Sequence, residues 1–235
     1  MPDPLTDLAQ LPGVPSAVAA ATAAVDVVLR DRGLRQVSEQ ARAEALLASA
    51  EASASLTGDA ELWRPGAVRL SAELPGLAGL IRVAPGQALA RAHAVVARGV
   101  LPDDELGRTA AGATAATRMR DLTALLARPS SAPAVVLGAV VHAEIASVEA
   151  FGAASGLVAR AAEHLVLVSS GLDPHVVILV EAGHAADPPG YRAALAGYAD
   201  GGVSGVGRWI TWCAAAVARG AELSPVAAGR PASPT

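Results

Sequence analysis

Alanine most constrains what this chain can fold into, because 57 of the 235 residues are alanine while aromatic residues make up only 3%. A core built from alanine, leucine and valine favours helices, since alanine loses no side-chain entropy in a helix and adds little to a sheet. Hydrophobic residues make up 52% of the chain, which excludes a wholly disordered protein. The composition therefore predicts a mostly helical protein with one core.

Charge and cysteine content exclude several classes of function. The net charge is −4 and the pI is near 5.7, so the chain lacks the positive excess that neutralises nucleic-acid phosphates. Cys213 is the single cysteine, which leaves no intrachain disulfide and no cysteine-based metal cluster. The longest apolar run, residues 132–141, is far shorter than the ~20 residues of a membrane-spanning helix. Residues 1–11 do not resemble a signal peptide, and we expect a cytoplasmic protein that binds neither membrane nor nucleic acid.

Capping signals divide the chain into successive helices. Ser16 and Ser38 are predicted N-caps, and Gly33 and Gly58 are the matching stops. Prolines and glycines interrupt residues 63–83, where we expect a loop or a small β-hairpin flap. Further predicted helices span residues 85–99, 118–128, 131–147, 155–170, 193–198 and 205–223.

No linker or repeat divides the chain into separate domains. We expect an N-terminal segment over residues 1–37, whose first helix packs on the core. One helical domain is predicted over residues 38–223 and a disordered tail over residues 224–235.

Small residues gather at 148–154, between the helix predicted over 131–147 and the one that begins near Ser155. Unpaired N–H groups and the positive end of the helix dipole favour an anion at such a place, and small side chains let a phosphate reach the backbone. The same residues also suit tight packing between the two helices, so both interpretations remain open.

Residues 142–160 resemble the signature of the Fic/Doc (Fido) proteins, H-P-F-x-[DE]-G-N-G-R-x-x-R, which another histidine precedes by seven residues. Five positions match the signature, the aliphatic position before it and its upstream histidine: His142, Val148, Phe151, Gly156 and Arg160. The resemblance extends over roughly residues 38–215 and implies a single all-α, Fido-like domain. Family members typically transfer a nucleoside monophosphate, usually AMP from ATP, to a hydroxyl group of a target protein.

The departures from the signature fall on the residues that carry the family's chemistry. Glu149 stands at the catalytic histidine, Ala153 at the carboxylate that holds Mg²⁺, and Leu157 at the first arginine. A solvated glutamate has a pKa of ~4.3, so Glu149 is a weak base unless burial raises that pKa, and its charge repels phosphate. The other two replacements remove a magnesium ligand and a grip on the outer phosphates.

A second segment, Ser53–Gly58, fits the frame of the family's inhibitory helix, [ST]-x-x-x-E-[GN], with Thr57 in place of the glutamate. In the family this glutamate blocks the arginine of the outer phosphates, whose place Leu157 takes here. Ser53, Thr57 and Gly58 are therefore interpreted as a vestigial inhibitory motif that has lost its arginine partner.

These residues leave several functions open. The first is a pseudoenzyme without the family's activity, which binds a protein or a small-molecule ligand. The second is a transferase of altered chemistry, in which Glu149 is the general base and the donor is a different activated group. A scaffold that docks a partner on an apolar helical face is the third, and a homodimer is compatible with each.

The candidate site follows from the resemblance. His142 could orient Glu149, two helical turns further on, or be a core histidine bonded to a backbone carbonyl group. Contacts with an anion or nucleotide are expected from Phe151, Gly152, Ala154, Ser155, Gly156 and Arg160. ATP or another nucleotide would suit the resemblance, but Mg²⁺ lacks its carboxylate ligand, and the spacing of the histidines predicts no other metal site.

Overall fold

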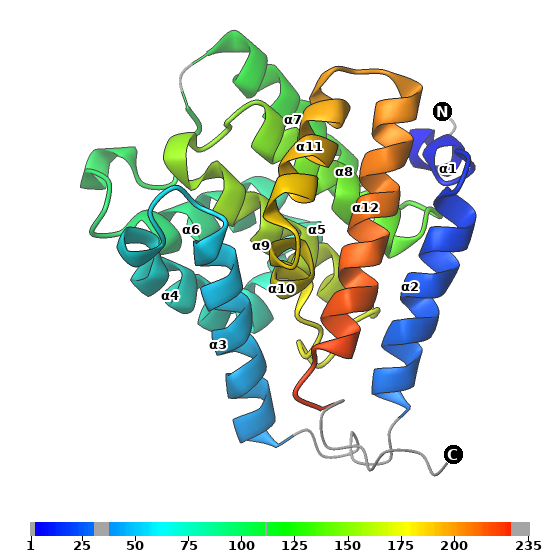
Figure 1. Ribbon diagram of the computed structural model, residues 1–235. Coiled ribbons are helices and arrows are strands. Elements are labelled where there is room, and N and C mark those ends of the chain that lie inside the picture. The colour runs from blue at the N-terminus through cyan, green and yellow to red at the C-terminus, as the bar shows by residue number, and fades with distance from the viewer. Residues whose placement is uncertain (1–2, 31–37, 111, 227–235) are drawn as a thin grey trace.

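The computed structural model describes residues 3–30, 38–110 and 112–226, which form helices joined by short connections (Figure 1). These described residues contain no β-strand, only an isolated bridge between Arg98 and Leu101. The prediction of an all-α protein is therefore confirmed. Among the same residues, no helix combines the length and the apolar character that crossing a membrane requires.

The helices follow one another closely along the chain. Their bounds are α1 Pro4–Leu8, α2 Val14–Leu29, α3 Glu39–Ser55, α4 Ala60–Ala78, α5 Leu80–Val83, α6 Pro85–Ala97, α7 Ala113–Leu126, α8 Ala134–Ser147, α9 Ser155–Ser169, α10 Val180–Ala185, α11 Pro188–Ala199 and α12 Val203–Glu222. Among the described residues, short 3-10 turns lie at Asp103–Glu105 and Gly152–Ala154.

The antiparallel pair α8 and α9 forms the centre of the molecule. Residues 135–143 of α8 and 157–167 of α9 are all buried, as the apolar run over 131–147 predicts for an enclosed helix. α8 packs against α7, α11 and α12, and α9 packs against α3, α4 and α6. The turn that carries the Fic-like residues therefore joins the two most enclosed helices.

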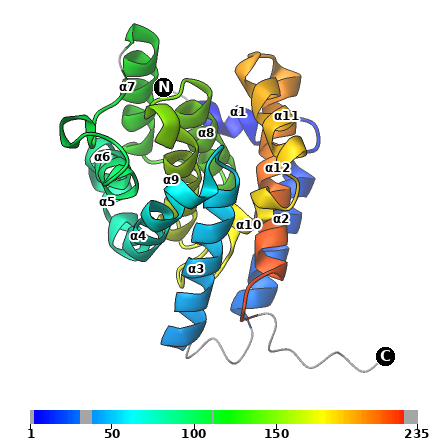
Figure 2. The ribbon, with the colours of Figure 1, turned by 60° about the vertical axis from the view of Figure 1, so that its left-hand side comes forward.

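The outer helices lie on two sides of this pair. Figure 2 shows α2, α11 and α12 on one side and α4, α5 and α6 on the other, and α2 runs alongside α12 in both ribbon views. Ser224, just beyond α12, is buried. The predicted stop at Gly33 and most of the predicted tail over 224–235 lie outside the described residues.

Residues 63–83 correct the sequence prediction, because they belong to the helices α4 and α5 rather than to a loop or hairpin. The buried residues of α4 recur at helical spacing: Trp63, Gly66, Ala67, Leu70, Ser71, Leu74, Leu77 and Ala78. Gly66 serves close packing, since a Cβ atom there would lie only 2.0 Å from the carbonyl oxygen of Val96 in α6. Helix burial thus overrides Pro65 and Pro75, which lie inside α4.

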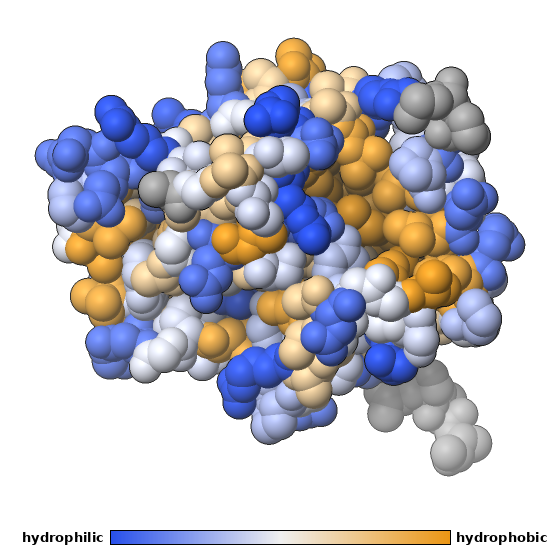
Figure 3. Space-filling view, turned by 90° about the horizontal axis from the view of Figure 1, so that it is seen from above, coloured by the Kyte–Doolittle hydropathy of each residue, from blue (hydrophilic) through white to orange (hydrophobic). Residues whose placement is uncertain are grey.

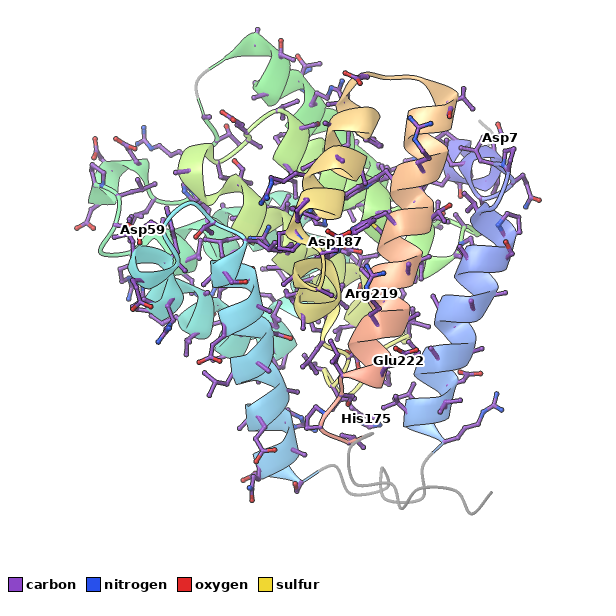
Figure 4. All side chains as sticks on the ribbon, in the orientation of Figure 1. Asp7, Asp59, His175, Asp187, Arg219 and Glu222 are labelled. Carbon is purple, nitrogen blue, oxygen red and sulfur yellow. The ribbon has the colours of Figure 1, made fainter. Side chains whose placement is uncertain are left out.

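Helix capping follows the sequence in part. The Ser38 hydroxyl accepts a hydrogen bond from the N–H of Ala41 at 3.1 Å, which confirms the predicted cap of α3. The prediction for Ser16 is wrong, because α2 begins at Val14 after Gly13, whose φ of 84° is left-handed. Asp59 and Asp187 cap α4 and α11, and Figure 4 labels both.

Candidate functional site

The motif turn, residues 148–154, reverses the chain between α8 and α9. Two of its residues have a left-handed backbone, Glu149 with a φ of 48° and Gly152 with a φ of 55°. The Ser155 hydroxyl donates to the carbonyl oxygen of Gly152 at 2.7 Å and accepts from the N–H of Phe151 at 2.8 Å. Ser155 therefore holds the turn closed at the beginning of α9.

The predicted anion site depends on free amide groups around the beginning of α9. The N–H of Gly152 donates to Glu149 at 2.9 Å, and the N–H of Ala154 donates to Phe151 at 3.1 Å. The N–H of Ser155 donates to the carbonyl oxygen of Gly152. These bonds within the turn occupy three of the donors that an anion would need.

The side chains at the positions of the family's catalytic, magnesium-binding and phosphate-binding residues differ in their exposure to solvent. Glu149 and Ala153 are exposed, whereas Leu157 is buried in the core. Phe151, an expected nucleotide contact, is also buried, and its ring packs against that of His93 with the centroids 4.9 Å apart. The phenylalanine of the signature is therefore a core residue here.

Arg160, the last arginine of the signature, lies inside the molecule with 2% of its surface exposed. Its Nε donates to the Ser53 hydroxyl and its Nη2 to the Ser53 carbonyl oxygen, both at 2.9 Å. Its Nη1 donates to the Tyr191 hydroxyl at 3.2 Å. Gly156 makes room for this group, because a Cβ atom there would lie 3.1 Å from Nη1. Arg160 thus joins α9 to α3 and α11.

The vestigial inhibitory motif lies at the end of α3. Ser53 binds Arg160, while the Thr57 hydroxyl donates to a carbonyl oxygen of α3 at 2.7 Å. Gly58 has open space where a Cβ atom would stand. The segment therefore contacts the last arginine of the signature, Arg160, through Ser53, while Leu157 stands at the position of the first arginine.

His142 does not orient Glu149. α8 ends at Ser147, so Glu149 lies beyond the helix and is exposed, whereas His142 is completely buried. His142 Nδ1 lies 2.6 Å from Glu163 Oε2, and its Nε2 lies 2.8 Å from the Tyr191 hydroxyl. His142 is thus a core histidine, but its partners are two side chains rather than the backbone carbonyl group that we expected.

His184 of α10 contacts the same carboxylate oxygen, because its Nε2 lies 2.8 Å from Glu163 Oε2. The indole N–H of Trp212 donates to His184 Nδ1 at 3.2 Å. Indole can only donate, so the proton of a neutral His184 must be on Nε2, where it points at Glu163. One hydrogen-bonded chain, buried except at Trp212 and called the core chain below, is therefore formed by Arg160, Tyr191, His142, Glu163, His184 and Trp212.

The core chain contains groups of opposite charge, the Glu163 carboxylate and the Arg160 guanidinium. Burial raises the pKa of Glu163, but its interactions with His184 and His142 outweigh burial and hold that pKa well below its usual value. Burial also lowers the pKa of His142 to about 4, against the raising effect of Glu163. At neutral pH the core chain therefore contains the Glu163 carboxylate, a neutral His142 and the Arg160 guanidinium cation.

Three residues of the core chain could also be considered as metal ligands. Potential ligand atoms of His142, Glu163 and His184 lie within 4.8 Å of one another. The nitrogen–oxygen separations of 2.6 and 2.8 Å are hydrogen-bond lengths, and the Trp212 indole directs the His184 proton onto the nitrogen that a metal would need. The donor set therefore fits a hydrogen-bonded cluster better than a metal centre.

A second buried cluster surrounds His164. Its Nδ1 lies 3.1 Å from Glu181 and its Nε2 lies 3.1 Å from Asp173, so the imidazole contacts a carboxylate at each nitrogen. Burial lowers the pKa of His164, but the charge of Glu181 and the hydrogen bonds raise it to about 10. Asp173 also accepts hydrogen bonds from the N–H groups of Val177 and Ile178. The protonated imidazole fixes the connection between α9 and α10.

Sequence reasoning did not identify these clusters. The spacing of the histidines predicted no metal site, and no role was assigned to Glu163, His164 or His184. One signal could have indicated them, because Glu163 and His164 interrupt an otherwise apolar stretch of α9. Charged side chains on an enclosed helix need partners, although the identity of those partners depends on the tertiary fold.

Comparisons with known proteins support the fold. No protein-family model matches the sequence, and no curated protein matches it either. Among solved structures, the chain is similar to a Fic family protein from Desulfovibrio desulfuricans G20, with a TM-score of 0.71 and 16% sequence identity. The match covers 88% of this chain and 73% of the other. The all-α domain therefore has the Fic fold, as the residues of the motif turn predict.

Proposed function

We propose that this chain is a Fic-fold binding protein that does not transfer nucleotides. Nucleotidyl transfer depends on positioning the phosphates and neutralising their charge. The motif turn offers an exposed methyl group at Ala153, a buried aliphatic side chain at Leu157 and a carboxylate at Glu149. None of these side chains can hold Mg²⁺–ATP as the family's residues would, so the retained scaffold is left with a binding role.

The engagement of Arg160 is the observation that carries this proposal. Arg160 is the one motif arginine that remains, and each of its three nitrogens donates to Ser53 or Tyr191. A phosphate could reach the guanidinium only if α3 and α11 released it. Releasing it would leave Ser53 and Tyr191 without their buried partner. The guanidinium of Arg160 therefore stabilises the fold and does not bind the phosphates of a nucleotide donor.

A transfer assay tests the proposal. The protein is incubated with ATP labelled in the α-phosphate, Mg²⁺ and a cell extract, and labelled protein is measured. We expect no incorporation above that of a heat-denatured sample. Labelling that requires the native protein and falls with Glu149→Ala would contradict the proposal.

Restoring family residues tests the inherited geometry. Glu149→His with Ala153→Asp changes two exposed positions, so this variant should fold. Adding Ser155→Asn and Leu157→Arg completes the set of four restorations, while Ala150 and Ala154 still differ from the signature. Labelling that appears only in the completed variant would support a disabled scaffold. Circular dichroism of both variants controls for folding, because Leu157 lies in the core.

One observation favours a second candidate function, an active transferase that uses Glu149 and a different activated donor. Glu149 is exposed at the position of the family's catalytic histidine, and its φ of 48° is unusual for a residue other than glycine. A thermal-shift screen of nucleotides, nucleotide sugars and common metabolites identifies ligands of the native protein. Assays of the turnover of those ligands then separate the two functions. A ligand whose turnover is lost in both Glu149→Ala and Glu149→Gly would favour the enzyme.

A further inference from the structure

A large groove lies between α11, α12 and the connection that joins α1 to α2. Its volume is about 950 Å³, at the upper end of the range that small-molecule pockets occupy. The side chains that line it are mainly small or apolar: Leu11, Pro12, Gly13, Ala193, Ala194, Val203, Ser204, Gly207, Arg208, Thr211, Trp212 and Ala215. This α11–α12 groove contains no residue of the motif turn, so it is a separate candidate site.

Apolar side chains are exposed to solvent at the α11–α12 groove. Val203, which lines the groove, has 69% of its surface exposed. Figure 3 shows apolar surface gathered on the right-hand half of the face seen from above, the side on which α2 and α12 lie in Figure 1. Apolar surface in a concave site is the usual lining for the body of a ligand.

Trp212 provides a fixed aromatic wall. Its N–H is held by His184 of the core chain at 3.2 Å, and the Arg219 guanidinium lies 5.0 Å from the centre of its ring. Its ring also rests on Gly190, where a Cβ atom would lie 2.8 Å from it. Arg219 extends from α12, as Figure 4 shows. Three contacts thus orient the indole before a ligand arrives, which reduces the entropy cost of binding.

Arg208 gives the groove its charge. It is exposed, and its Nη1 donates to the Ser204 hydroxyl at 2.6 Å. Within the part of the chain that the structure describes, no carboxylate lies within 4.0 Å of its guanidinium, and no acidic residue lines the groove. A guanidinium above an apolar groove complements a molecule with an apolar body and a planar anionic group, which it can bind with two parallel hydrogen bonds.

We propose that the α11–α12 groove binds an amphipathic carboxylate, with its carboxylate on Arg208 and its apolar body along the small residues as far as Trp212. The binding of this ligand class does not depend on the proposed loss of nucleotidyl transfer, because the motif turn and the α11–α12 groove share no residue. The volume of the groove and the charge of Arg208 favour such a small molecule over a second copy of the chain, which is one outcome of the test.

Calorimetric titration with decanoate, below its micelle concentration, tests the proposal. We expect saturable binding of one decanoate per chain, with a change in tryptophan fluorescence. Arg208→Gln should weaken binding by at least about tenfold, because it removes the charged partner. Ala193→Phe should abolish binding by filling the groove. The matched controls Arg192→Gln and Ala196→Phe change exposed residues of α11 outside the groove and should bind like the wild type.

Three results would overturn the proposal. The first is no saturable binding of decanoate, or binding that Arg208→Gln and Ala193→Phe leave intact. Equal binding of decyltrimethylammonium, which has the same chain with a positive head group, is the second, because it removes the role of Arg208. The third is a concentration-dependent dimer in sedimentation that Ala193→Phe dissociates, because a second copy would then occupy the groove. The transfer assay tests the motif turn and not the α11–α12 groove. The proposed loss of transfer and the proposed binding of a carboxylate can therefore fail independently of each other.

Discussion

Arg160 and Ser53, which stand 107 residues apart in the chain, are joined by two hydrogen bonds of 2.9 Å in the core. The same guanidinium reaches Tyr191 and, through His142, the carboxylate of Glu163. A residue whose type and position suit phosphate binding is thereby made part of the structure. In this Fic-fold chain the guanidinium therefore links α9 to α3 and α11.

Arg160→Ala should lower the free energy of unfolding by about 3 kcal/mol, since it leaves buried hydrogen-bonding groups unpaired and the Glu163 charge uncompensated. Ser53→Ala should lower the free energy of unfolding by about 1 kcal/mol, because Arg160 would still donate a hydrogen bond to the backbone carbonyl oxygen of residue 53. Urea denaturation followed by circular dichroism measures both. Arg192→Ala, on the exposed face of α11, is the control, and an equal small effect for all three variants would show that Arg160 is not part of the structural core.

Stability should fall as the pH rises from about 6.5 to about 10. The pKa of His164 is raised to about 10 in the folded protein, so its contribution is complete below the unfolded pKa near 6.5 and is lost as the pH passes through the folded pKa. The slope should reach about 1.4 kcal/mol per pH unit. Denaturation at several pH values measures it.

His164→Gln is the variant that isolates this effect. It should be less stable than the wild type at pH 6, and its stability should change less between pH 6.5 and pH 10. A wild type whose stability is flat over that window would show that the imidazole is not held as a cation between Asp173 and Glu181.

Acidification below about pH 6.5 should also destabilise the protein. The folded pKa of His142 is lowered to about 4, so the unfolded chain takes up its proton first and stability falls between pH 6.5 and pH 4. The lowered pKa of Glu163 acts in the same direction below the usual range of a glutamate. NMR titration of the histidine rings measures the midpoint for His142. A midpoint near 6.5 would show that His142 is not buried in the core chain.

Two glycines of α4 should respond in opposite directions to alanine. Gly66→Ala places a methyl group against the backbone of Val96 and should cost about 3 kcal/mol. Gly76→Ala has open space and should stabilise the helix by about 0.5–1 kcal/mol. Thermal denaturation compares the two variants, and stabilisation by both would mean that α4 and α6 do not pack closely.

The sequence predicted those features that depend on local chemistry. The cap at Ser38, the opening of a helix at Pro85 and the enclosed apolar helix over 131–147 follow from neighbouring residues, and so does the motif turn. α4 was missed because Pro65 and Gly66 are turn formers in isolation, whereas in the fold α6 packs against that face.

The buried clusters could not be derived in the same way. Glu163 meets His142 and His184, which lie 21 residues before and after it, and the sequence carries no local mark of either pairing. The sequence suggested a contact between Arg160 and an anion or nucleotide, whereas its partners in the structure are Ser53 and Tyr191. Such contacts depend on how helices cross, which one sequence does not specify.

The most direct measurement is an NMR titration that follows the Nε–H signal of Arg160 while Mg²⁺–ATP is added. A guanidinium committed to Ser53 should give a slowly exchanging signal that does not move at millimolar nucleotide. A saturable shift of that signal would show that Arg160 receives phosphate, and it would contradict the assignment of this arginine to the structural core.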